Sequence, residues 1–315
     1  MSAVLQTYCL DYWKGNFPPN SIYFAMEKMI DALRAQSIEV ETAVSGRTMS
    51  AFGSGGTLAY VLYPHDTEEL KSCLAALVGY RYHVLGMGSN TLISDFGLAC
   101  VVSTRRLDGV FVEGECLRAY AGARLPVLAG IAQKAGLAGL EPLSGIPGSV
   151  GGACRSNAGA FGTSMSDLVE KVRLVGADFD RWVVPEELHW GYRSARFVGV
   201  VAEVVLRLTK DSSEAIAHRM QSVAAERRLR QPVGPSLGSV FKGVNGVPAA
   251  RLIQSCGLKG VRLGGATVSG VHCNFIMNCG GATSRDYLRL AERIEEEVYQ
   301  RHGVRLEREF VLMHD

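Results

Sequence analysis

The chain has little of several features that would place a protein in a broad class at once. No run of about 18 apolar residues occurs in its 315 residues, so no segment is expected to cross a membrane. Its beginning lacks a basic region followed by an apolar core, so no secretory signal peptide is expected. The formal net charge is only +2, which disfavours a general attraction to nucleic acid or to an anionic membrane surface.

Paired cysteines are also missing. The eight cysteines include no CxxC pair and are scattered through apolar or helix-like segments. This pattern is typical of a reduced, cytoplasmic protein rather than of a disulfide scaffold. His272, Cys273 and Cys279 lie close together in the sequence, but their spacing is not that of a zinc site, so no metal is expected.

Glycine, in contrast, is abundant. The 36 glycines exceed the usual share of about 7%. They are densest in EPLSGIPGSVGGACRSNAGAFG, from Glu141 to Gly162. Glycine allows positive φ angles and close approach to the backbone, and ordering so many costs conformational entropy. The stretch is interpreted as a backbone wall with N–H groups directed at a flat or anionic ligand, in preference to a string of tight turns.

A second glycine-rich segment, GMGSN at residues 86–90, directly follows a predicted buried strand, Tyr82–Leu85. The next residues, LIS, read as a strand rather than a helix. The segment is therefore not a dinucleotide fingerprint, which requires a helix after the glycines. Its N–H groups can still form an anion-binding nest for a diphosphate.

The order of elements favours an α+β fold, because helices and strands are mixed without strict alternation. The closing residues, 304–313, are expected to form one regular strand. A helix is predicted to begin at a cap on Asn20 or Ser21, and another to run from Ser212 or Ser213 to Arg230. The predicted parts of the chain are an N-terminal helical arm (1–47), a first domain (48–210) and a C-terminal domain (211–315).

Four sets of motifs, in order along the chain, carry a family resemblance: GMGSN, SGIPGSVGGA with NAGAFG, GYR with GSVFK, and LKGVRLGGATVS with NFIMN and GVRLEREF. The chain resembles the UDP-N-acetylenolpyruvoylglucosamine reductases, flavoenzymes of peptidoglycan precursor synthesis. The resemblance covers about Thr48 to Met313. The absence of an extra substrate loop after the Leu208 strand resembles the shorter subtype of that family.

The resemblance implies an FAD-binding domain of the vanillyl-alcohol oxidase and p-cresol methylhydroxylase type, followed by an α+β substrate-binding domain. It implies two cofactors, FAD and NADPH. Folds of this type sometimes link FAD through histidine, but His83 lies within a predicted strand, so noncovalent FAD is expected. NADPH would reduce FAD, and reduced flavin N5 would deliver hydride to C3 of the enolpyruvyl ether, giving UDP-N-acetylmuramate.

This chemistry needs a cation or acid at the substrate carboxylate and a proton donor near C2. The resemblance implies that Arg193 in GYRS binds the carboxylate, that Ser239 in GSVFK donates the proton, and that Glu309 in LEREF contacts the carboxylate or relays a proton. Without the resemblance, these residues read as a solvated cation, an ordinary turn serine and an exposed strand charge. Glu309 is expected to have a raised pKa. Regular alternation would place it on the same face as Glu307.

The resemblance also implies ligand-binding residues. Those assigned to FAD are Gly86, Met87, Gly88, Ser89, Asn90, Ser144, Gly145, Gly148, Gly152, Asn157 and Gly159. Those assigned to the substrate are Tyr192, Arg230 and Lys242. Arg227 and Arg228 are interpreted as a solvated helix end. The chain departs from the family at FGSGG, where FRIGG is frequent, and at Gly243, where asparagine is common; both departures bear on ligand binding.

Two other functions stay open from the residues. One is a flavin oxidoreductase of the same fold with another substrate, and the other is a silent nucleotide-binding module. The presence of Arg193, Ser239 and Glu309 together argues against the silent module. A nucleic-acid binder is least favoured, because only the short basic run near Arg230 supports it and no aromatic residues interleave. The expected partners are a UDP-sugar and NADPH, with no membrane, and the protein is expected to be a monomer.

Overall fold

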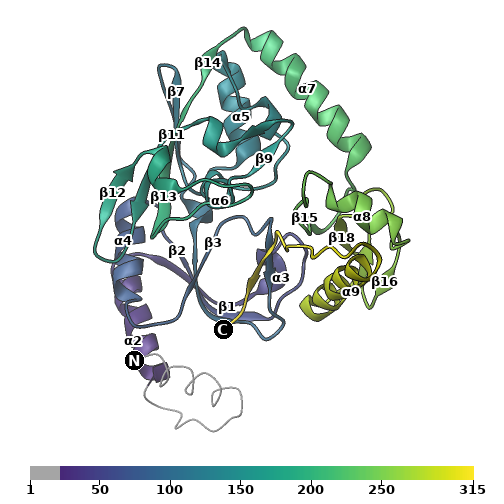
Figure 1. The fold of residues 1–315 in the computed structure, drawn as a ribbon. Coiled ribbons are helices and arrows are strands. Elements are labelled where there is room, and N and C mark those ends of the chain that lie inside the picture. The colour runs from purple at the N-terminus through teal and green to yellow at the C-terminus, as the bar shows by residue number, and fades with distance from the viewer. Residues whose placement is uncertain (1–21) are drawn as a thin grey trace.

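The structure is a computed structural model that describes residues 22–315. Its first helix, α2 (Ile22–Ala35), agrees with the predicted helix, whose cap at Asn20 or Ser21 lies outside the described residues. Figure 1 shows two sheets in the N-terminal half of the fold and a separate C-terminal part, which helix α7 joins along the outer edge.

The first sheet carries the glycine loop of residues 86–90 at one end. Its strands occur in the order β1-β2-β5-β3, with β1 antiparallel and the others parallel. Helices α2 and α4 pack through Ile30 and Leu70 against Val102 in one core cluster. The Asp66 side chain caps α4 by accepting from the Glu69 N–H. The elements are β1 (Glu39–Ser45), α3 (Gly46–Met49), β2 (Thr57–Tyr63), α4 (Thr67–Ala76), β3 (His83–Leu85), β4 (Thr91–Ile93) and β5 (Leu98–Ser103).

The second sheet is antiparallel throughout, in the order β12-β11-β13-β7-β6. Helices α5 and α6 pack on it through Leu128 and Val150, which share a core cluster with Val172 and Val204. Alternating burial along β7 agrees with one face turned to this core. The elements of this part are β6 (Val110–Glu113), β7 (Cys116–Tyr120), α5 (Leu125–Lys134), β8 (Leu137–Ala138), α6 (Val150–Ser156), β9 (Gly159–Ala160), β10 (Thr163–Ser164), β11 (Val169–Val175), β12 (Asp180–Val183), β13 (Val200–Arg207) and β14 (Thr209–Lys210). Strands β8 and β14, and strands β9 and β10, form two separate two-stranded sheets.

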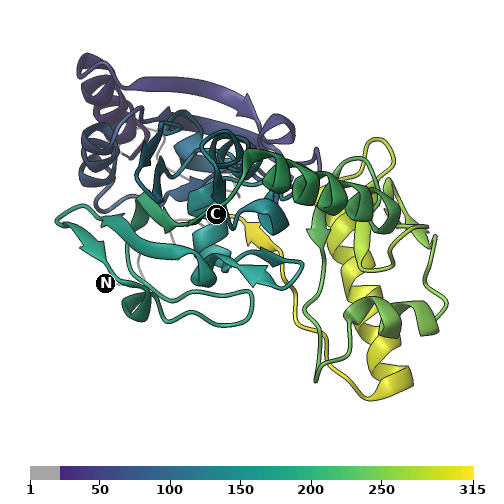
Figure 2. The ribbon, with the colours of Figure 1, turned by 90° about the horizontal axis from the view of Figure 1, so that it is seen from above.

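The C-terminal part packs a small antiparallel sheet, β15-β18-β17-β16, against α8 and α9. Helix α9 begins at a capping box of Thr283 and Asp286 and ends at Gly303 in the left-handed conformation. Viewed from above, α7 crosses from the N-terminal half to this part (Figure 2). The elements are α7 (Ser213–Arg230), β15 (Ser236–Ser239), α8 (Ala249–Ser255), β16 (Arg262–Leu263), β17 (Ala266–Val268), β18 (Phe275–Asn278) and α9 (Ser284–His302).

The final segment differs from the predicted strand of residues 304–313. Only β19 (Val311–Met313) is a strand, and it pairs in parallel with β4 of the N-terminal half. Residues 304–310 are irregular apart from a single bridge between Phe241 and Arg308. Glu307 and Glu309 therefore do not share an environment, since the Glu307 side chain is 71% exposed and that of Glu309 only 19%.

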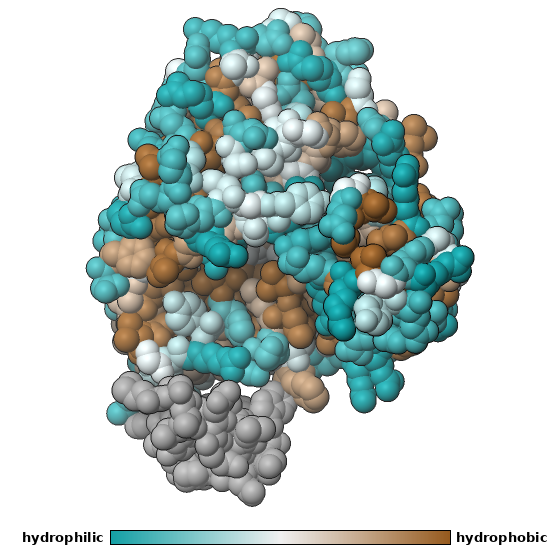
Figure 3. Space-filling model, viewed as in Figure 1, coloured by the Kyte–Doolittle hydropathy of each residue, from teal (hydrophilic) through white to brown (hydrophobic). Residues whose placement is uncertain are grey.

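The two halves also interlock elsewhere. Phe52 and Leu92, which precede the second sheet, belong to the core cluster of the C-terminal part. The Phe52 ring meets Tyr287 edge-on at 4.9 Å, and the Asn278 side-chain amide donates to the Phe52 carbonyl at 2.8 Å. Figure 3 shows one face that is mostly hydrophilic, with hydrophobic residues gathered around a hollow near its centre. Among the described residues, no helix combines the length and the apolar character needed to cross a bilayer.

Candidate active site

The loop of residues 86–90 leaves β3 with an unusual backbone. Gly88 has φ +68°, and a Cβ atom there would lie 2.0 Å from the Met49 carbonyl oxygen, so only glycine fits. Within residues 22–315, the main-chain N–H groups of Met87, Gly88 and Ser89 donate to no protein atom. Buried or half-buried N–H groups normally have partners, so three consecutive unpaired ones indicate a place for an anion.

The second glycine-rich stretch faces this loop. A Cβ atom on Gly86 would lie 2.7 Å from the Ser149 Oγ, and one on Gly148 would lie 3.2 Å from the Ser89 Oγ. The Ser149 hydroxyl is buried and has no hydrogen-bond partner among the described residues. Two closely apposed glycine segments, three unpaired N–H groups and an unpaired hydroxyl therefore form a narrow polar cradle, as a diphosphate requires.

Arg193 joins three segments that are far apart in the sequence. It lies in the tight turn between Gly191 and Ser194, at φ +52°. Its Nη2 donates to the Gly159 carbonyl at 2.7 Å, and its Nε lies 3.3 Å from Glu309 Oε1. The structure thus brings GYRS, NAGAFG and LEREF together at one guanidinium.

Glu309 is held by main-chain contacts on two sides. Its N–H donates to the Val240 carbonyl at 2.8 Å, and its carbonyl accepts from the Asn90 side chain at 3.1 Å. Burial raises the pKa of the Glu309 carboxyl, while nearby Arg193 and Lys242 oppose that shift. Desolvation is the main cause of this raised pKa, whereas the expectation from the sequence rested on a neighbouring substrate carboxylate.

Ser239 directly precedes the residue whose main chain contacts Glu309. It ends β15, is half-buried, and neighbours Val240, whose carbonyl binds the Glu309 N–H. Its hydroxyl makes no hydrogen bond to any described residue. Lys242 follows three residues after Ser239, and its Nζ lies 2.6 Å from Glu307 Oε1.

Tyr192 reaches from the Arg193 turn toward the C-terminal part. Its side chain is 65% exposed, and the Arg193 guanidinium carbon lies 5.2 Å from its ring centre. A Cβ atom on Gly243 would lie 3.9 Å from the Tyr192 hydroxyl. Tyr192 and Lys242 therefore approach the same edge of the site from different parts of the fold.

The basic end of α7 is arranged differently from the prediction. Arg230 is 74% exposed, and its nearest partner is Glu226 at 2.9 Å. Arg227 instead packs on the glycine-rich stretch, since a Cβ atom on Gly145 would lie 2.4 Å from Arg227 Cδ. Burial lowers the pKa of Arg227, and no carboxylate among the described residues pairs with it. Sequence reasoning missed Arg227, because the run ERRLR does not reveal which cation faces Gly145.

Asn157 and Ser144 make contacts within the protein. Asn157 ends α6 at φ +44°, and its side chain accepts from the Ser166 N–H and donates to the Gly191 carbonyl, both at 3.0 Å. Its carboxamide therefore supports the turn that carries Arg193. The Ser144 hydroxyl donates to the Glu141 carbonyl at 2.7 Å. The assignments of both residues to FAD stay predictions.

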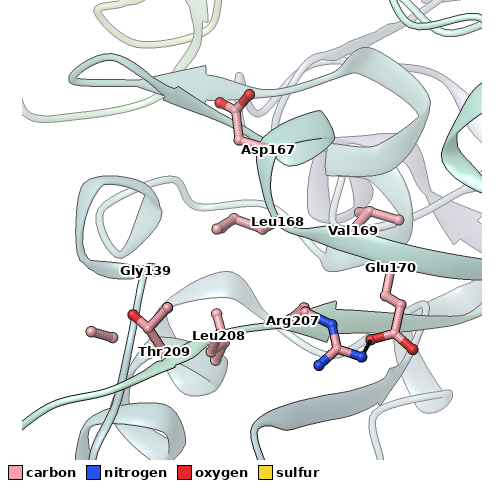
Figure 4. Close-up of a pocket in the computed structure, with 9 residues that line it drawn as sticks. Gly139, Asp167, Leu168, Val169, Glu170, Arg207, Leu208 and Thr209 are labelled. Carbon is pink, nitrogen blue, oxygen red and sulfur yellow. Dashed lines mark ion pairs between the residues drawn. The ribbon is translucent and has the colours of Figure 1, made fainter.

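A separate pocket of about 430 Å³ contains none of the predicted site residues (Figure 4). It lies between Gly139 and the ends of β11 and β13. Its cation, Arg207, is paired with Glu170 at 2.5 Å. Because that charge is already neutralised, the pocket offers less to an anionic ligand than the glycine cradle does.

The glycine cradle and the matching protein families together define the general class of this protein. Residues 58–178 match the family described as "FAD binding domain", and residues 229–313 match "UDP-N-acetylenolpyruvoylglucosamine reductase, C-terminal domain". The cradle formed by Gly88, Gly148 and Ser149 has the unpaired donors that the FAD diphosphate needs, so the residues present fit this cofactor. The class is that of FAD-dependent oxidoreductases, which confirms the predicted cofactor and the predicted α+β architecture.

Named relatives then define the family. The UDP-N-acetylenolpyruvoylglucosamine reductase of Halalkalibacterium halodurans is 35% identical over 91% of this chain and 99% of its own. That of Moorella thermoacetica is 42% identical over 81% of this chain and 87% of its own. The crystal structure of the Thermus caldophilus reductase is 36% identical, with a TM-score of 0.79 over 88% of this chain and all of that one. The chain belongs to the UDP-N-acetylenolpyruvoylglucosamine reductase family.

Proposed function

We propose that this protein reduces UDP-N-acetylglucosamine enolpyruvate to UDP-N-acetylmuramate, with NADPH as reductant and FAD as a noncovalent cofactor. The observation that carries the proposal is the contact between Arg193 and Glu309, beside the loop of residues 86–90 and the strand of Ser239. Arg193 and Glu309 are in contact, and the Glu309 main chain binds both Asn90 of that loop and Val240, which follows Ser239; this grouping supports the proposal. When bound, FAD supplies the hydride chemistry, and the protein supplies placement and charge.

Arg193 binds the substrate carboxylate in this proposal. Its guanidinium can hold a carboxylate with two parallel hydrogen bonds and stays charged at any working pH. The Glu309 carboxylate now 3.3 Å from its Nε marks the position that such a group would take. Hydride addition to C3 moves negative charge onto the carboxylate as an enolate. Arg193, held by the Gly159 carbonyl, stabilises that charge once the substrate carboxylate has taken this position.

Glu309 and Ser239 divide the proton chemistry. Because burial raises the Glu309 pKa, its neutral form is favoured over that of an exposed glutamate and can donate a hydrogen bond to the substrate carboxylate. Ser239 Oγ gives its proton to C2 as the enolate collapses. A serine hydroxyl is a weak acid, so this step requires the strongly basic enolate carbon and the nearby charge of Lys242.

The UDP diphosphate needs cations outside the catalytic group. Arg227, half-buried on Gly145 without a carboxylate partner, supports a diphosphate contact at the end of α7. Lys242 and Tyr192 border the opposite edge of the site. Arg230 stays a predicted substrate contact, although it is more exposed and is paired with Glu226. A monomeric state, a cytoplasmic location and the boundaries at residues 47 and 210 also stay predictions.

An anaerobic absorbance experiment tests the function. NADPH should bleach the flavin band of the purified protein, and UDP-N-acetylglucosamine enolpyruvate should restore it. In Arg193→Met, NADPH should still bleach the flavin, but the return should slow by roughly 100-fold or more, because a charge-stabilising donor is lost. The control is Arg181→Met, a surface cation paired with Glu187. A wild-type protein that binds no FAD, or whose flavin is not reoxidised by this substrate, would overturn the proposal.

A further inference from the structure

Arg105 lies behind the loop of residues 86–90 in an unusual environment for a cation. It is part of the short 3-10 turn Thr104–Arg106 that follows β5. Its Nε donates to the Gly86 carbonyl and its Nη2 to the Met87 carbonyl, each at 3.2 Å. Nη2 also donates to the Met49 carbonyl at 2.8 Å. Arg105 therefore ties the loop to α3, which ends at Met49.

Every hydrogen-bond partner of Arg105 within residues 22–315 is a neutral carbonyl. The fourth is that of Thr48, at 3.4 Å from Nη1, and no described carboxylate forms an ion pair with the side chain. Burial lowers the pKa of Arg105, which reflects the cost of holding an unneutralised charge away from water. Its neighbour Arg106 is different, since it is half exposed and pairs with Glu39 at 3.1 Å.

The hydrogen bonds of Arg105 determine where the loop's N–H groups point. In a planar trans peptide the C=O and the following N–H point in opposite directions. Holding the Gly86 and Met87 carbonyls on the Arg105 side therefore turns the N–H groups of Met87 and Gly88 to the other side. The Ala51 N–H donates to the Gly88 carbonyl at 2.9 Å, so the Ser89 N–H also points away from this side. These three N–H groups are the unpaired ones of the cradle.

The charge of Arg105 acts through the same peptides. A cation at the C=O ends aligns with each peptide dipole and makes the potential at the N–H ends more positive. We propose that Arg105 is a positioning residue for the diphosphate of FAD: it fixes the loop with its N–H groups outward and supplies a charge that the diphosphate balances. This inference rests on the proposed function and adds a residue that never touches the cofactor.

The test compares Arg105→Met and Arg105→Lys with the control Arg106→Met. FAD is titrated into each apoprotein, with quenching of flavin fluorescence as the readout, at several salt concentrations. Arg105→Met should weaken FAD binding about 10- to 100-fold, as expected for loss of hydrogen bonds from a charged group, and should reduce the salt dependence of binding. Arg105→Lys should keep the salt dependence but bind several-fold more weakly, because an ammonium cannot hold both carbonyls. Arg106→Met should bind within about twofold of wild type.

A second ligand and the apoprotein stability separate the proposal from a purely structural role. ADP carries the diphosphate without the flavin, and its affinity should fall in Arg105→Met by about the same factor as that of FAD. If Arg105 only held two segments together, Arg105→Met would lower the thermal stability of the apoprotein. Its folded fraction would still bind FAD and ADP with wild-type affinity and salt dependence. That result would overturn the inference. If Arg105→Met does not fold, wild-type affinity in Arg105→Lys would overturn it instead. Failure of wild type to bind FAD would refute the proposed function itself.

Discussion

Replacing Gly88 by alanine should damage the cofactor cradle far more than the loss of one glycine usually does. Gly88 has φ +68°, and the added Cβ would lie 2.0 Å from the Met49 carbonyl oxygen. Real Cβ atoms essentially never come closer than 3.0 Å, so loop and carbonyl must separate by at least 1.0 Å, which is 3.0 minus 2.0. The same carbonyl binds Arg105, so the displacement reaches the bonds that orient the loop.

The chain contains a matched control for this change. Gly114 has nearly the same φ, +65°, but no atom lies within 4 Å of the Cβ that alanine would add. Gly114→Ala therefore measures the cost of the left-handed backbone alone, about 1–2 kcal/mol. Gly88→Ala carries that cost and a steric term of about 1–3 kcal/mol for forcing an atom into a packed region. The expected total at Gly88 is about 2–5 kcal/mol.

The assay is thermal unfolding of each apoprotein together with FAD titration. Gly114→Ala should lower the melting temperature by a few degrees and leave FAD affinity unchanged, because it lies in the turn between β6 and β7. Gly88→Ala should lower it further and weaken FAD binding at least tenfold. Equal loss of stability in the two variants, with wild-type FAD affinity in Gly88→Ala, would refute the reasoning from the 2.0 Å contact.

Three further outcomes follow from the site. In stopped-flow reoxidation, Asn157→Asp should slow the return of the flavin band at least tenfold, because the Gly191 carbonyl loses its hydrogen-bond donor. The affinity for FAD should stay within about twofold of wild type. A large loss of FAD affinity would instead favour the predicted contact between Asn157 and the cofactor. Arg227→Met should raise the KM for the UDP-sugar about 10- to 100-fold and Arg230→Met less than threefold, with the reverse order refuting the assignment of Arg227. The raised pKa of Glu309 means that the folded state favours the neutral carboxyl. The resulting contribution to stability is fully present below the pKa of the unfolded state and is lost as pH rises through the pKa of the folded state. Urea unfolding should therefore show Glu309→Gln gaining stability relative to wild type as pH rises from 4 to 7, and a constant difference would contradict the shift.

Much of the fold could be predicted because local rules and tertiary structure agree. Ser212 and Thr283 begin helices where their side chains cap the first turn. GMGSN follows a strand and precedes another, as its sequence predicts. Arg193 and Glu309 meet although 116 positions separate them, because the fold brings the turn Gly191–Ser194 and the segment before β19 to one place.

The remainder depends on contacts that spacing alone does not determine. Residues 304–310 alternate as a strand would, yet they pair at a single bridge, so Glu307 stays at the surface and Glu309 does not. Along α7, Arg227 and Arg230 are three residues apart and nearly on one face. Of the two, only Arg227 packs on the glycine-rich stretch, in the space left by the missing side chain of Gly145. The proposed role of Arg105 depends on the directions of the Gly86 and Met87 carbonyls, which cannot be predicted from the sequence.

The exchange of Phe52, Leu92 and β19 between the halves has a consequence for how the chain can be divided. A cut within α7 would give two fragments, each lacking part of its own interior. The first would leave β4 without its parallel partner β19, and the second would lose Phe52 and Leu92 from around Tyr287. Neither fragment keeps its complete core, and each carries the piece that the other lacks. The protein is therefore suited to reconstitution from complementary fragments, in which recovery of bound flavin would report their association.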